Sequence, residues 1–197
     1  MVVTPVPRAP AVSLTRAILA GFIASLALLV VFAFAYGIAL VLARILPYDR
    51  PLVSTLAEWF RALTHNSLVD LALPNPFAAV VLFTIGGVFW ALLYAFVFDS
   101  QLGGPEWRRG MLFALLPWAF SLCVFLPLVG GGFLGFGLGA GPLPIVGNLI
   151  LHAVYGAVLA RLYGPFGEVV DGEEQVASEV QLSALAYCES GAVRVVW

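Results

Sequence analysis

Four long apolar segments constrain this chain more than any other feature of its sequence. They cover about residues 17–43, 77–98, 110–128 and 144–163, and they are almost free of charge. A helix needs roughly 20 apolar residues to cross the hydrocarbon core of a bilayer, and each segment meets or nearly meets that length. Because a helix satisfies its own backbone hydrogen bonds in lipid, the sequence predicts an all-α integral membrane four-helix bundle.

The composition excludes an ordinary soluble fold. Of the 197 residues, 62% are hydrophobic and 10% are charged, whereas soluble domains carry about 25% charged residues. A soluble domain of this size has too little interior to bury so much apolar surface. The net charge of −2 does not indicate a nucleic-acid partner. The lipid bilayer is the expected partner, and either a membrane protein or a second copy of the chain is an additional candidate.

The chain divides into an apolar body and a polar tail. We expect residues 1–165 to form the four-helix transmembrane domain and residues 166–197 to form an acidic cytoplasmic tail without stable structure, because the tail is too polar to build a core. The first segment follows two arginines, as a signal peptide would. It is much longer than the roughly 7–15 apolar residues of a signal sequence, so we interpret it as a retained membrane helix.

Two connections have distinctive sequences. Residues 46–76 contain Thr55 and Glu58 at the spacing of a capping box, which predicts a short amphipathic helix lying either in the membrane interface or packed as an ordinary loop helix. Residues 127–144 contain seven glycines and no charge. We expect a flexible or re-entrant connection there, which needs protein or water cover at membrane depth.

The arginines near the segment ends predict the orientation. Arg8, Arg16, Arg108, Arg109 and Arg161 would lie on one side, and three arginines, at positions 44, 50 and 61, on the other. The positive-inside rule then places both termini in the cytoplasm of a multi-pass protein of the cell membrane.

Small residues recur at every fourth position in the second and fourth segments, and the two rows are offset by 69 residues. Such rows let membrane helices approach closely. The offset indicates two tandem helical hairpins, and we expect the second and fourth helices to pack against each other through these rows, which are Gly87, Ala91 and Ala95, and Gly156, Ala160 and Gly164.

The fourth segment carries the one polar stripe within the predicted spans. Asn148, His152 and Tyr155 are spaced four and three residues apart, so they share one face of a helix. Polar side chains in a membrane helix usually face the bundle interior. The stripe is therefore a candidate ligand, proton or metal site, and the competing interpretation is a set of hydrogen bonds between helices.

The side chains that several kinds of functional site require are missing from the sequence. The chain has two histidines, His65 and His152, and no Cys/His spacing typical of zinc sites. No carboxylate lies within a predicted span, so the acidic relay of many proton-coupled transporters is missing. We therefore predict no catalytic residue, no metal ligand and no cofactor, and the sequence does not favour an enzyme.

Two stretches resemble a known group of proteins. They are Arg109–Phe113 followed by Leu116-Pro117-Trp118, and Asn148–Gly156. The chain is similar over about residues 80–165 to a family of small bacterial four-helix integral membrane proteins, a domain of unknown function. The resemblance implies this fold and a cell inner membrane, and it implies no activity. Phe83 stands where the internal repeat would place a partner for His152, which argues against a paired-histidine site.

Two functional hypotheses follow. The first is a non-catalytic structural or accessory subunit of the membrane. The alternative is a small transporter or channel-like protein that uses the polar face of the fourth helix. A membrane enzyme is a third and weaker hypothesis.

Overall fold

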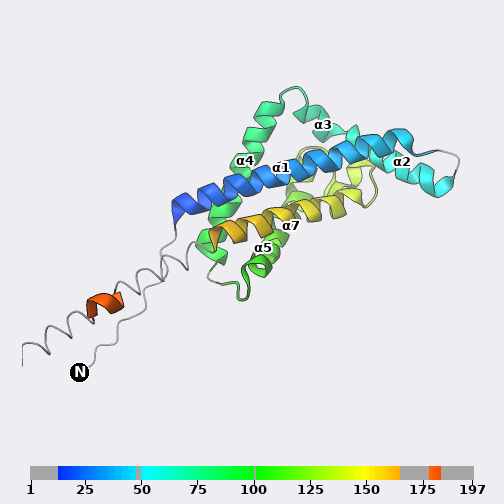
Figure 1. Ribbon diagram of the computed structural model, residues 1–197. Helices are drawn as coiled ribbons and strands as arrows, with labels where there is room; N and C mark the ends of the chain where they lie inside the picture. Colours follow the sequence, from blue (N-terminus) through cyan, green and yellow to red (C-terminus); the bar gives the residue numbers. More distant parts are fainter. Residues whose placement is uncertain (1–12, 48–49, 100, 165–177, 183–197) are drawn as a thin grey trace, which may run out of the picture.

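Helices account for the architecture of the chain. The computed structural model describes residues 13–47, 50–99, 101–164 and 178–182, and in these ranges it contains helices and turns but no strand (Figure 1). Most of the acidic tail lies outside the described residues, so the expected lack of structure there stays a prediction. The part of the tail that is described, residues 178–182, is helical and exposed.

Four helical segments are long and apolar enough to cross a membrane, and the predicted all-α bundle is confirmed. They are α1 (Leu14–Ile45), Pro76–Phe98, Glu106–Leu128 and α7 (Leu143–Tyr163). Each begins before the apolar run that predicted it, by up to four residues. A helix continues to satisfy its own backbone where it leaves the hydrocarbon, so the helices extend into their charged flanks.

The second and third spans are not uniform α-helices. In the second span, α4 (Pro76–Leu93) continues into a π-helical turn, η1 (Tyr94–Phe98). In the third span, α5 (Glu106–Phe120) continues into a π-helical turn, η2 (Ser121–Phe125), and ends in α6 (Leu126–Leu128). Pro117 lies inside α5 and removes one hydrogen-bond donor from the helix shortly before η2 begins.

The helices pack as two hairpins joined by the first and last spans. Packing is most extensive between α5 and α7, between α1 and α4, and between α1 and α7. In Figure 1, α1 (blue) and α7 (gold) run side by side, and α4 (green) crosses α1. The predicted pairing of the first helix with the second, and of the third with the fourth, is therefore present.

Aromatic side chains fill the centre where α4 and α5 meet. Tyr94 and Phe113 are buried, and their ring centroids lie 5.1 Å apart in an edge-to-face arrangement. Trp90 contacts Phe113 at 6.4 Å in the same manner, and Tyr94 also meets Tyr163 of α7 at 5.9 Å. Edge-to-face contacts stabilise aromatic pairs beyond their buried area, so this cluster holds three spans together.

The connection after α1 forms two helices, α2 (Pro51–Thr64) and α3 (Ser67–Ala72). The predicted capping box at Thr55 and Glu58 is wrong, because α2 begins one turn earlier with a proline in its first turn. The fixed backbone angle of proline suits that position. Thr55 therefore lies inside the helix, where its hydroxyl donates to the Pro51 carbonyl over 3.0 Å.

The glycine-rich connection contacts α2 and α3. It contains η3 (Phe133–Leu138), a 3-10 helix. Gly141 adopts a positive φ of 54°, and a Cβ atom there would overlap the Trp59 ring of α2. A Cβ atom on Gly130 would lie 3.4 Å from the Ser67 hydroxyl of α3. α2 and α3 therefore supply part of the protein cover that an irregular apolar connection requires, while Phe133 and Phe136 of the connection are exposed.

Candidate functional site

The polar stripe of α7 begins at Asn148, which lies opposite the third span. The Asn148 side-chain amide donates to the Ser121 hydroxyl over 2.9 Å, at the residue where η2 begins. One turn earlier, the Trp118 indole N–H donates to the Ile145 carbonyl over 3.2 Å. These two bonds connect the third span to α7 where Pro117 and the π-helical turn interrupt regular hydrogen bonding.

His152 is bound to its own helix. Its Nδ1 lies 2.9 Å from the Asn148 carbonyl oxygen, and because a carbonyl oxygen only accepts, Nδ1 carries the hydrogen. The side chain is half-buried. This bond fixes the imidazole along α7 and leaves Nε2 as the remaining ring nitrogen for any ligand.

Tyr155 lies at a junction of three helices. Its hydroxyl donates to the Gly87 carbonyl of α4, and its side chain is 3% exposed. Ser25 of α1 also lies against Gly87, and its hydroxyl donates to the Gly21 carbonyl over 2.7 Å. A Cβ atom on Gly87 would overlap the Ser25 hydroxyl, so this close approach requires glycine.

The three residues of the stripe do not converge on one site. Asn148 binds the third span, His152 binds its own helix, and Tyr155 binds α4. Among the described residues, no three His, Cys, Asp or Glu side chains gather as a metal site would require. The arrangement connects helices, and one of its polar atoms, Asn148 Oδ1, is buried without a hydrogen-bond partner among the described residues.

The two rows of small residues pack on different helices from those expected. Ala91 of α4 lies against Gly21 of α1, where an added Cβ atom would be 2.5 Å from the Ala91 Cβ. Ala160 of α7 lies against Gly110 of α5, where an added Cβ atom would be 2.7 Å from the Ala160 Cβ. The predicted packing of one row on the other is therefore wrong, because each row is matched by a glycine of its hairpin partner.

The glycines and the serine that complete these contacts were missed from the sequence. Gly21 and Ser25 of α1 belong to a row of small residues at the same four-residue spacing, which begins at Ala17. Gly110 and Ala114 form a similar pair in α5. The spacing signal that identified the other two rows was therefore present in all four spans.

An ion pair joins the second and third spans at the end of the bundle near the N-terminus of α1. Arg109 Nη1 lies 3.1 Å from Asp99 Oδ1, and both side chains are partly buried. Asp99 follows η1, and Arg109 lies in the first turn of α5. Each charge is placed at the unfavourable end of its helix dipole, and the pairing offsets that disadvantage. The ion pair is therefore a contact between the second and third spans.

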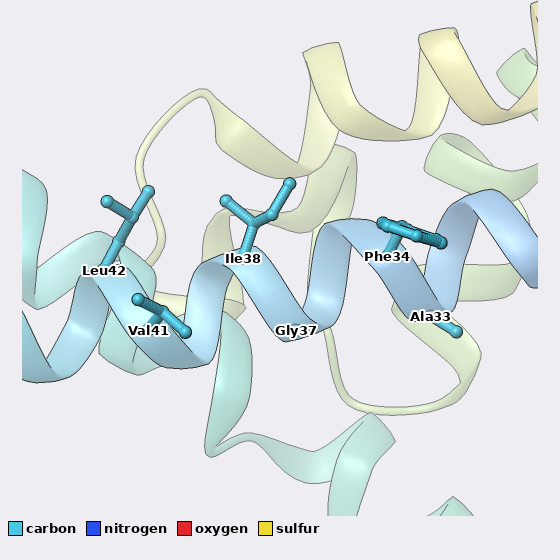
Figure 2. Close-up of a pocket in the computed structure, with 6 residues that line it drawn as sticks. All are labelled: Ala33, Phe34, Gly37, Ile38, Val41 and Leu42. Carbon is cyan, nitrogen blue, oxygen red and sulfur yellow. The ribbon is translucent and has the colours of Figure 1, made fainter.

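Two apolar hollows open on the outer surface of the bundle. One has a volume of about 690 Å³ and lies beside Gly86 and Trp90, between the second and third spans. The other has a volume of about 590 Å³ and follows α1 from Ala33 to Leu42 (Figure 2). Neither hollow is lined by a residue of the polar stripe.

No family profile, no curated protein and no solved structure matches the chain. The resemblance to small bacterial four-helix membrane proteins is therefore supported at the level of four membrane-spanning helices, and no family is identified.

Proposed function

We propose that this four-span membrane protein is a non-catalytic structural or accessory subunit of a membrane assembly. The observation that carries the proposal is the use of the intramembrane polar groups. Asn148 and Tyr155 each bind a neighbouring span, and His152 binds its own helix. Side chains committed to such bonds stabilise the bundle, whereas a transport path or active site needs polar groups free for a ligand.

Affinity purification of the full chain in mild detergent tests this role. We expect one other membrane protein to copurify in a fixed ratio to the chain, and to remain after the membranes are washed with high salt. The control is an unrelated tagged four-span protein at the same expression level. Recovery of the chain alone, after cross-linking in intact membranes, would contradict an accessory role.

The alternative is a small transporter or channel-like protein that uses the polar face of α7. The buried Asn148 Oδ1 without a partner among the described residues favours it, and so does the π-helical turn that begins at Ser121, because such turns occur often at functional sites. A water-filled path reaching this face would supply the missing partner.

Cysteine accessibility separates the two functions. In a chain whose Cys123 and Cys188 are replaced by alanine, His152→Cys should resist a water-soluble thiol reagent if the protein is an accessory subunit. Arg161→Cys, at an exposed position, is the reactive control. Rapid labelling of the cysteine at position 152 would favour the transporter hypothesis.

The arginine distribution supports an orientation with both termini in the cytoplasm, whereas the location in a bacterial inner membrane is proposed from the resemblance alone. Of the described arginines, 16, 108, 109 and 161 lie at the end of the bundle where α1 begins, and 44, 50 and 61 lie at the end where α1 finishes. The excess at the first end fits the positive-inside rule.

A further inference from the structure

The hollow along the second half of α1 is an open apolar groove. Phe34 and Ile38 are 73% and 56% exposed, and a Cβ atom on Gly37 between them would meet no other atom within 4 Å. Figure 2 shows Phe34, Ile38 and Leu42 projecting from the same side of the helix, with bare backbone at Gly37. The groove therefore has aliphatic and aromatic walls and a floor without a side chain.

The length of the groove matches one leaflet of a bilayer. At about 1.5 Å per residue, the stretch from Ala33 to Leu42 is about 15 Å long, which is half of the roughly 30 Å hydrocarbon core. The volume of about 590 Å³ lies within the range of small-molecule sites. A single acyl chain aligned with α1 has this shape and chemistry.

A positive charge lies at the end of the groove. Arg44 is exposed in the last turn of α1. It follows Val41 by three residues and Gly37 by seven, so it projects from the same face of the helix. An arginine guanidinium binds phosphate oxygens through paired hydrogen bonds, and Arg44 lies just beyond the apolar residues that line the groove.

The same charge disfavours a second copy of the chain as the occupant. Two copies inserted in the same direction would meet through this face in a twofold arrangement, in which each residue near the axis faces its own counterpart. The two Arg44 side chains would then be brought together, and like charges across an interface are unfavourable. An anionic headgroup instead complements Arg44.

We propose that the groove from Ala33 to Leu42, together with Arg44, is a binding site for an anionic phospholipid. One acyl chain lies over Gly37, and the headgroup phosphate is bound by Arg44. This inference is independent of the accessory role, because a lipid site does not require a protein partner.

Native mass spectrometry of the full chain in detergent tests the site. The probes are phosphatidylglycerol and phosphatidylcholine with the same acyl chains, titrated separately. We expect the wild-type protein to bind phosphatidylglycerol about fivefold more tightly, which is the factor for one arginine at a membrane surface. Equal affinities for the two lipids would overturn the proposal.

Two variants with matched controls separate the headgroup from the chain. Arg44→Gln should remove the preference for phosphatidylglycerol, whereas Arg161→Gln, which changes an exposed arginine at the opposite end, should keep it. Gly37→Leu should lower the affinity for both lipids at least fivefold, because the leucine side chain fills the groove. Gly147→Leu is its control, because Gly147 also faces open space but does not line the groove.

Three further results would overturn the proposal. One is an Arg44→Gln variant that keeps its lipid preference. Another is a Gly37→Leu variant that binds both lipids with the same affinities as the Gly147→Leu variant. The third is a wild-type dimer that Gly37→Leu separates, which would assign the groove to a second copy. A cooperative thermal unfolding transition is the control that each variant is folded.

Discussion

At the scale of single residues, the bundle depends on places where two backbones nearly touch. Gly110 of α5 and Gly156 of α7 face each other, and both are buried. A Cβ atom on Gly156 would lie 2.8 Å from the Cβ of Ala114 and would also overlap the Gly110 backbone. In lipid no hydrophobic drive brings helices together, so packing of this kind supplies much of their association.

Replacing Gly156 by leucine should therefore separate α5 from α7. We expect a loss of about 1–3 kcal/mol in the free energy of unfolding, the usual cost of overfilling a packed interior, measured by thermal or denaturant unfolding in detergent. Gly147→Leu on the same helix is the control, because a Cβ atom there meets nothing within 4 Å. Equal stability of the two variants would show that α5 and α7 do not approach closely.

Tyr155 provides a second prediction at this scale. Tyr155→Phe removes the hydrogen bond to the Gly87 carbonyl and keeps the ring. We expect a loss of about 0.6 kcal/mol, the average for hydrogen bonds between membrane helices, and no effect on assembly with a partner protein. The same unfolding assay measures it. Wild-type stability of this variant would show that the bond does not stabilise the contact between α4 and α7.

At the scale of elements, α2 and the glycine-rich connection form one unit. Neither is suited to the membrane by itself, because α2 is amphipathic and the connection has many backbone groups outside regular helices. The two meet where the Trp59 ring lies against Gly141. The Trp59 side chain is therefore expected to hold α2 in place.

Truncation of that side chain should loosen α2. For Trp59→Ala we expect amide hydrogen exchange across residues 51–64 to accelerate about tenfold, because exchange reports the local free energy of opening. Leu52→Ala is the control, since Leu52 is 76% exposed on the same helix. Unchanged exchange in the Trp59 variant would mean that other contacts hold α2.

At the scale of the whole molecule, the length of α1 exceeds that of the other spans. Its 32 residues extend about 48 Å at 1.5 Å per residue, compared with a hydrocarbon core of roughly 30 Å. The first half of α1 packs against α4 and α7, and the second half meets α2. The helix is therefore longer than the hydrocarbon core, and its second half provides the surface on which α2 packs.

The orientation of the molecule can be measured with single cysteines. In a chain without Cys123 and Cys188, Leu52→Cys should react with a membrane-impermeant maleimide in intact bacterial cells whose outer membrane is open to the reagent. Gln101→Cys, an exposed position at the other end of the bundle, should react only after the inner membrane is permeabilised. The reverse pattern would place both termini outside the cytoplasm.

The sequence by itself determined the number of spans and which of them pair. The number of spans follows from lipid as the solvent, because an apolar run of sufficient length has no alternative to a membrane helix. The pairing was indicated by the 69-residue offset between the small-residue rows of the second and fourth segments. The start of α2 was misplaced by the capping-box pattern, because proline at the first turn specified an earlier start.

Only the tertiary structure decided which faces meet. The small rows of α4 and α7 have the same spacing, and spacing identifies a face of a helix but not its partner. Gly21 and Gly110 supply the partners, and that choice depends on how the helices cross. The same holds for the polar stripe, since Asn148 and Tyr155 share a face of α7 and yet bind different spans, because the third span and α4 each pass close to that face at a different height.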